Sequence, residues 1–221
     1  MDILSTLITD KVQYTNLMEL FIILTVMMFL PFMVFMMTSF VRLVITFSFL
    51  KSALGVQQGI PSQVLVGLAM VLTLFIMKPV VDDITKNSLE PYSNGQITLD
   101  KASEEAQKPI REFLLKQTRK SDLKLFTDMS DLKEEELRRD NIPLSVLAPA
   151  FAISELKTAF QIGFLIYIPF IIVDLVIASV LMSMGMFMLP PVMISLPLKL
   201  LLFVMVDGWS LLVKSLVLGF S

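Results

Sequence analysis

Six charged side chains lie in the hydrophobic segment 143–221: Glu155, Lys157, Asp174, Lys199, Asp207 and Lys214. Burying an ionised side chain in hydrocarbon is unfavourable by several kcal/mol. Each of the six therefore needs a partner, a water-filled cavity or a position at a membrane boundary. Their possible chemistry is acid–base catalysis by the carboxylates, ion binding, or pairing with groups of opposite charge.

Catalysis by paired aspartates is the first of these possibilities. A membrane aspartyl protease needs two aspartates that share one proton on facing helices. Asp174 lies in IIVDLVI and Asp207 in VMVDGWS, and neither has the GxGD context of such enzymes. The chain also has no cysteine or histidine, which removes the usual nucleophile–base pairs and nearly every transition-metal site. These observations disfavour an aspartyl protease and a metal site, and we expect no cofactor and no metal.

Residues 181–191 read LMSMGMFMLPP, with methionine at every second position from Met182 to Met188. Thioethers can bind Cu(I), although copper sites usually recruit cysteine or histidine as well. Methionines that fill an irregular core are the other ordinary interpretation. Gly185 loosens the helical turn and Pro190–Pro191 removes backbone donors, so this stretch is predicted to interrupt any long helix.

Pairing within segment 143–221 is left open by the sequence. Glu155 and Lys157 are two residues apart and do not face each other on a helix, so their partners come from elsewhere in the chain or from another copy. Glu155 and Lys199 have the right signs for a pair, but spacing does not show contact. Boundary residues without a particular partner are the alternative.

The elements that must position these residues follow from composition. The chain has 221 residues, 55% of them hydrophobic, a mean hydropathy of +0.77 and a net charge of −2. Of the 38 charged residues, 25 lie between Asp82 and Asp140. We therefore predict an all-α chain with a polar N-terminal segment at 1–16, a first hydrophobic helical block at 17–81, a hydrophilic helical insert at 82–142 and a second hydrophobic helical block at 143–221. The first ten residues carry no positive charge, so we expect no cleavable signal peptide in the chain as given.

Within the first block, residues 17–37 have the length of a membrane span, with a kink predicted at Pro31. Arg42 and Lys51 do not share a helix face and are predicted to snorkel or to face water near a boundary. A further hydrophobic helix is predicted to begin at Pro61 and to end at Lys78–Pro79.

The insert has the apolar spacing of short amphipathic helices, with Ser121–Asp122 as a predicted cap between two of them. Its charge run LKEEELRRD, residues 132–140, is predicted to be a solvated face. The second block is predicted to be broken repeatedly, and broken helices in an apolar environment need protein or a cavity to cover their backbone. We therefore expect an assembly interface or a pore lining. The breaking prolines are Pro149, Pro169, Pro190, Pro191 and Pro197.

Two long motifs resemble a known family. TSFVRLVITFSFLKSALGVQQGIPSQVLVGLAMVLTLFIMKPV, residues 38–80, resembles the first half of the FliP family of flagellar type III export-gate proteins. SELKTAFQIGFLIYIPFIIVDLVIASVLMSMGMFMLPPVMISLPLKLLLFVMVDGWSLLV, residues 154–213, resembles the second half. The virulence-associated SctR family shares parts of both motifs, but LKTAFQIGF and the long charged insert fit the flagellar branch better.

The resemblance implies that the protein is no enzyme and consists of hydrophobic kinked helices and helical hairpins of an oligomeric, membrane-associated export gate. It implies a homo-oligomer of about five copies, with FliQ and FliR, further export-apparatus and basal-body proteins, unfolded export substrates and membrane lipid as partners, and no nucleic acid. The gate would lie in the bacterial inner membrane within the flagellar basal body, with the insert periplasmic. The equivalent virulence subunit is the alternative, and an ion- or metal-coupled membrane carrier is the alternative from another class.

The resemblance also implies roles for residues. Met184, Met186, Phe187 and Met188 would form a gasket in the pore, with Gly185, Pro190 and Pro191 as the loop breakers. Many family members have three consecutive methionines, whereas here Phe187 stands in the middle. Glu155 and Lys199 would form an ion pair between neighbouring subunits, so Glu155→Ala or Lys199→Ala is expected to weaken assembly. Asp174 is a pore or interface candidate.

Overall fold

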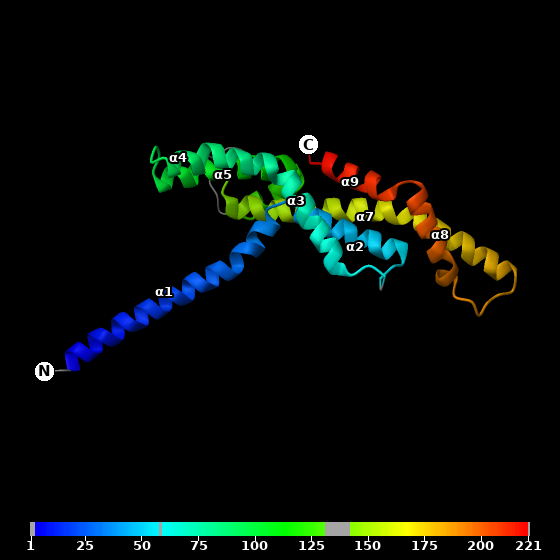
Figure 1. Ribbon diagram of the computed structural model, residues 1–221, viewed down its shortest axis with the longest axis horizontal. Coiled ribbons are helices and arrows are strands. Elements are labelled where there is room, and N and C mark those ends of the chain that lie inside the picture. The colour runs from blue at the N-terminus through cyan, green and yellow to red at the C-terminus, as the bar shows by residue number, and fades with distance from the viewer. Residues whose placement is uncertain (1–2, 58, 131–141, 221) are drawn as a thin grey trace. The chain divides into compact units, whose positions relative to one another are not determined.

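The chain is all-α in its computed structural model, which describes residues 3–57, 59–130 and 142–220. Within these ranges every regular element is a helix, which confirms the predicted fold class (Figure 1). The chain forms two compact units, one that ends at Met37 and one that begins at Thr38.

The first unit is the single helix α1 (Ile3–Met36), which continues through Pro31. Its segment Met18–Met36 is long and apolar enough to cross a membrane, with a mean hydropathy of 2.3. The hydroxyl of Thr25 donates a hydrogen bond to the carbonyl of Phe21 at 2.7 Å. A polar group in an apolar helix is thereby satisfied by the helix's own backbone.

In the second unit, α2 (Phe40–Leu54), α3 (Ser62–Ile84) and α7 (Leu144–Ser183) form the framework (Figure 1). Their buried apolar residues join those of α8 and α9 in one core, which includes Leu43, Phe47, Leu50, Ala69, Phe170, Phe203 and Leu216. Helix α2 lies close to α7 at Gly163, where an added Cβ would stand 2.5 Å from the Phe49 ring. The glycine is therefore required by this close approach.

Helix α3 does not end at Lys78–Pro79, and that prediction is wrong. The helix runs on to Ile84, then through a π-helical turn η1 (Thr85–Leu89) into α4 (Glu90–Ser93). Pro79 removes one backbone bond only, and an ion pair between Lys78 and Asp82 at 2.7 Å bridges the turn across it. The whole stretch Ser62–Ser93 has the length and hydropathy of a membrane span.

The insert contains α5 (Leu99–Gln117) and α6 (Lys120–Asp128), as short amphipathic helices were predicted. Thr98 caps α5 by accepting a hydrogen bond from the backbone N–H of Lys101. The predicted cap at Ser121–Asp122 is wrong, because both residues lie in the first turn of α6 and Arg119 occupies the cap position. The charge run at 132–140 lies outside the described residues.

The second hydrophobic block has fewer breaks than predicted. Helix α7 continues through Pro149 and Pro169, and α8 (Pro191–Met205) continues through Pro197. The chain breaks at 184–190, where Pro190 and Pro191 were expected to act, and again at Val206–Asp207 before α9 (Gly208–Leu218), where there is no proline. Helices α8 and α9 are bent by 63°.

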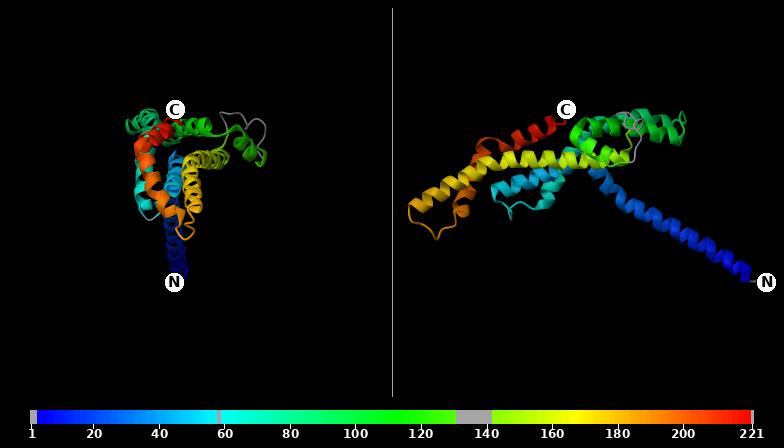
Figure 2. Two further views of the ribbon diagram at one scale, coloured as in Figure 1. Left: turned by 90° about the vertical axis from the view of Figure 1, so that its right-hand side faces the viewer. Right: turned by 180° about the vertical axis from the view of Figure 1, so that it is seen from behind.

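Within the described residues, three helical stretches are long and apolar enough to cross a membrane, and the bent pair α8–α9 would make a fourth. The insert helices lie at the N-terminal end of α7, and the loop that joins α7 to α8 lies at its other end (Figure 2). The fold therefore separates the hydrophilic insert from the methionine-rich stretch.

Candidate functional site

The methionine loop, residues 184–190, begins with a regular helix-ending motif. The backbone N–H of Met186 donates to the carbonyl of Leu181, and that of Gly185 donates to the carbonyl of Met182, both at 3.0 Å. Gly185 has φ +75°, in the left-handed region. These are the two bonds and the glycine of a Schellman motif, which satisfies the last carbonyls of α7. Helix α8 then begins with Pro191, a residue suited to a first helical position.

All four predicted gasket residues lie in this loop and are exposed. Met188 is 98% exposed and Phe187 is 79% exposed, while Met184 and Met186 are 61% and 38% exposed. Each is an apolar side chain without a core to fill, so the interpretation of these methionines as filling of an irregular core does not fit the described chain. Their role as a pore gasket stays a prediction.

An ion pair joins the two helices that carry the loop. The Lys199 ammonium on α8 donates to Asp174 Oδ2 on α7 at 2.6 Å, and to the carbonyl of Ala53 at the end of α2 at 3.2 Å. Lys199 is buried, and Asp174 Oδ1 is buried without a hydrogen-bond partner among the described residues. The pair fixes the register of α7 against α8 at the base of the hairpin.

A second ion pair is fully buried between α2 and α7. The guanidinium of Arg42 donates from Nε to Glu155 Oε2 at 2.8 Å and from Nη2 to Glu155 Oε1. This two-bond geometry is the strongest form of an arginine–carboxylate contact. Arg42 was predicted to snorkel or face water and is instead 4% exposed, so that prediction is wrong. Glu155 supplies the charge that makes its burial possible.

The same guanidinium also anchors the C-terminal segment. Arg42 Nη1 donates to the carbonyl of Gly219 and Nη2 to Gln117 Oε1, both at 3.2 Å. The Phe220 ring covers the guanidinium carbon at 3.7 Å, a cation–π contact. The network therefore ties α2 and α7 to the insert helix α5 and to the segment after α9.

The family resemblance implied an ion pair between Glu155 and Lys199 of neighbouring subunits, and the structure gives each of them a partner in its own chain. Because the predicted contact joins two copies, the structure of one chain does not test it, and it stays a prediction. Arg42 was missed as the partner of Glu155. The available signal was an arginine in the middle of the apolar run FVRLVIT, which in an apolar environment requires a carboxylate.

Lys157 has its partner on the insert helix α6. Asp122 accepts hydrogen bonds from the Lys157 ammonium and, at 2.9 Å, from the Ser154 hydroxyl. Burial raises the pKa of the Asp122 carboxyl, but these two donors, with Arg119 nearby, outweigh it and bring the pKa below its ordinary value. Asp122 therefore attaches the insert to α7 as a carboxylate.

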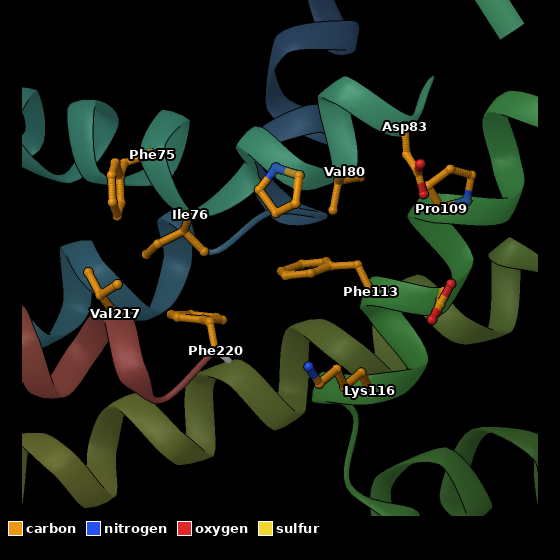
Figure 3. A pocket seen from close by; sticks show the side chains of 11 residues that line it. Phe75, Ile76, Val80, Asp83, Pro109, Phe113, Lys116, Val217 and Phe220 are labelled. Carbon is orange, nitrogen blue, oxygen red and sulfur yellow. The ribbon is translucent and has the colours of Figure 1, made fainter. Parts of the chain in front are cut away.

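A cavity of about 430 Å³ opens beside the Arg42 network. Figure 3 shows its lining, which comes from α3, from α5, from the end of α9 and from the segment after it. Phe113 and Phe220 are stacked with ring centroids 6.3 Å apart, and Asp83 and Lys116 are among the charged residues of the lining. Phe220 lines the cavity and also covers the buried guanidinium of Arg42.

Comparison with known proteins decides the family. The model of the FliP family matches residues 23–216. The chain belongs to the FliP family. This confirms the resemblance that was based on the motifs at 38–80 and 154–213, both of which lie within the matched range.

Named FliP relatives agree over nearly the whole chain. The flagellar biosynthetic protein FliP of Bacillus subtilis (strain 168) is 52% identical over 212 residues, which is 96% of each chain. Its namesake in Pectobacterium carotovorum is 49% identical over 94% of this chain and 80% of its own, and that of Aquifex aeolicus is 45% identical over 96% and 90%. The chain is thus a FliP-family protein of flagellar biosynthesis with apolar helices long enough to cross a membrane.

Proposed function

We propose that this FliP-family chain is a pore-forming structural subunit of the flagellar type III export gate. In this proposal several copies, about five, join FliQ and FliR and further export-apparatus and basal-body proteins. Together they enclose the channel through which unfolded flagellar proteins leave the cell. The gate lies in the bacterial inner membrane within the flagellar basal body, and the insert is periplasmic.

The observation that carries the proposal is the exposed apolar tip of the α7–α8 hairpin. The side chains of Met188 and Phe187 are largely exposed to solvent in the single chain. Exposed apolar clusters of this kind mark contact surfaces in ordinary proteins. Copies arranged around an axis would bring these tips together. An apolar constriction excludes water and ions while closed, and unbranched methionines can reshape around a passing chain.

The ion pair at the base of the hairpin supports this role. Asp174 and Lys199 hold α7 and α8 in register and tie them to α2. A seal needs flexible side chains, and these must lie at a defined position along the pore. A hairpin of fixed register that carries flexible methionines in its loop meets both requirements. Asp174, predicted as a pore or interface candidate, acts in this proposal by positioning the loop.

The proposal is tested by the native mass of the protein in mild detergent, alone and co-expressed with FliQ and FliR. We expect a discrete oligomer of about five copies that recruits both partners. Co-expression with an unrelated small membrane protein is the control for non-specific association. A stable monomer that binds neither FliQ nor FliR would contradict the proposal.

A further inference from the structure

Two charged side chains of the second hydrophobic block are left over after the ion pairs are assigned. Four of the six have partners within the chain. Asp207 and Lys214 are exposed and have no partner among the described residues. They have opposite charges, so each is the kind of group that the other needs.

Asp207 stands where a lone carboxylate is hardest to accommodate. It lies at the break between α8 and α9, near the middle of an apolar helical pair long enough to be a membrane span. Its short side chain does not reach a membrane boundary from there, unlike a lysine. Its φ of +50° makes it the only residue other than glycine with a positive φ in the described part of the chain. The carboxylate of Asp207 therefore needs a group of opposite charge or a polar environment at this position.

Helix α9 presents this charge on a distinct stripe. Leu211, Lys214 and Leu218 are spaced three and four residues apart, which places them along one face of α9, and Asp207 stands at the cap position four residues before Leu211. Leu211 is 57% exposed and Leu218 is 59% exposed, whereas Leu212 and Leu216 face the core. Asp207 and Lys214 are about two turns apart, roughly 10 Å, which is too far for a pair within one chain.

We propose that the α9 stripe, defined as these four residues, is a contact between copies of this chain, in which Asp207 of one copy meets Lys214 of the next. This rests on the proposed oligomer. A shift of seven residues between the two helices pairs the charges, and the same shift sets Leu211 against Leu218. One stripe thus carries both halves of its own complement, which favours a second copy over a different protein. With this shift between parallel helices the contact runs head to tail, and a head-to-tail contact can close a ring.

Cysteine cross-linking in the full-length protein tests the contact. The chain has no native cysteine, so every disulfide-linked species reports the introduced pair. The double variant Leu211→Cys, Leu218→Cys is expected to give, on oxidation of the detergent-extracted assembly, a ladder of linked species larger than dimers. Leu211→Cys alone is expected to give none, and dimers from it would overturn the head-to-tail arrangement.

A matched pair on another helix controls for random collision. Leu74 and Val81 are also exposed and seven residues apart, on α3. The variant Leu74→Cys, Val81→Cys is expected to give no ladder. An equal ladder from this pair would overturn the proposal, because the linkage would then not depend on the α9 stripe.

Charge changes provide the second test. Lys214→Glu places two carboxylates together and is expected to lower the oligomer fraction on dilution about tenfold. Asparagine tolerates a positive φ, so Asp207→Asn can be added to Lys214→Glu without backbone strain. The double variant is expected to restore the oligomer fraction to within about threefold of wild type. Lys86→Glu, the same change on the exposed π-turn, is expected to have no effect.

The outcomes separate this inference from the proposed function. An intact oligomer that recruits FliQ and FliR, with no ladder and no effect of Lys214→Glu, would overturn the α9 contact alone. Absence of any oligomer in the wild type would instead contradict the proposed function and remove the basis of the contact.

Discussion

The buried charges of this chain are paired by residues far apart in the sequence. Arg42 and Glu155 are separated by 113 positions and are both shielded from water. A buried ion pair adds little to stability, since desolvation offsets most of the attraction, but a charge left alone by removal of its partner is strongly unfavourable. The pair therefore specifies how α2 meets α7.

Removal of either member of this pair is expected to destabilise the fold. Glu155→Gln or Arg42→Gln should each lower the free energy of unfolding by about 3–5 kcal/mol, because an uncompensated charge or a broken network stays buried. Denaturant unfolding in mild detergent measures this, with the exposed Lys86→Gln as control. The double variant Arg42→Met, Glu155→Gln should recover most of the loss. Wild-type stability of both single variants would refute the assignment.

A second cycle addresses the predicted contact between copies. Glu155→Gln and Lys199→Gln, alone and together, are compared by oligomer yield. If Glu155 also contacts Lys199 of a neighbouring subunit, the oligomer yield of the double variant is no lower than that of the single variant with the lower yield. Strictly additive losses would show that the two residues act only through their partners Arg42 and Asp174.

The attachment of the insert is expected to depend on pH through Asp122. Its pKa is lowered in the folded chain, so its contribution to stability is fully present above the ordinary aspartate pKa of about 4 and is lost as the pH falls through the lower folded value. Unfolding midpoints measured from pH 6 downward should fall for the wild type. Asp122→Asn should be less stable at pH 6 and should not show this loss, and parallel curves would contradict the pairing.

At the scale of elements, a helix ends where backbone geometry requires it. Gly185 adopts φ +75° and closes α7 with two backbone bonds, after which two prolines start α8. In the described part of the chain, no heavy atom outside its chain neighbours lies within 4 Å of a Cβ added there. The requirement for glycine is therefore conformational, not steric.

Gly185→Ala is expected to cost about 1 kcal/mol of stability, because a residue with a Cβ is strained in the left-handed region. Gly67→Ala is a matched control, since Gly67 lies inside α3 with open space around its Cβ position. That substitution should leave stability unchanged or raise it by up to about 1 kcal/mol. Thermal unfolding of both variants checks this, and a neutral Gly185→Ala would argue against the turn.

The methionine loop could be predicted from sequence because its breakers lie within a few residues of one another. The continuity of α7 through Pro149 and Pro169 could not, since a single proline removes one bond and packing against α2 decides whether the helix goes on. The partners of Glu155 and Lys157 were hidden for a related reason. Arg42 and Asp122 come close only through the tertiary fold, which spacing does not encode.

At the scale of the whole chain, apolar surface remains uncovered in both units. Met28 on α1, Leu74 on α3 and Met205 on α8 are each more than 70% exposed. Surfaces of this kind are covered by lipid or by other protein chains. In the proposed gate, neighbouring chains would cover this surface, and the methionine loop would be the part left facing the channel.

We propose that the methionine loop closes a pore, and ion flux through the assembled complex tests this closure. The purified complex with FliQ and FliR is reconstituted in liposomes, and ion release is measured for wild type and for Met186→Ala, Met188→Ala. Met70→Ala on α3 is the control for loss of a methionine elsewhere. We predict tight vesicles for wild type and control, and flux raised about tenfold or more when the loop is shortened. Equal flux from all three assembled complexes would contradict the account.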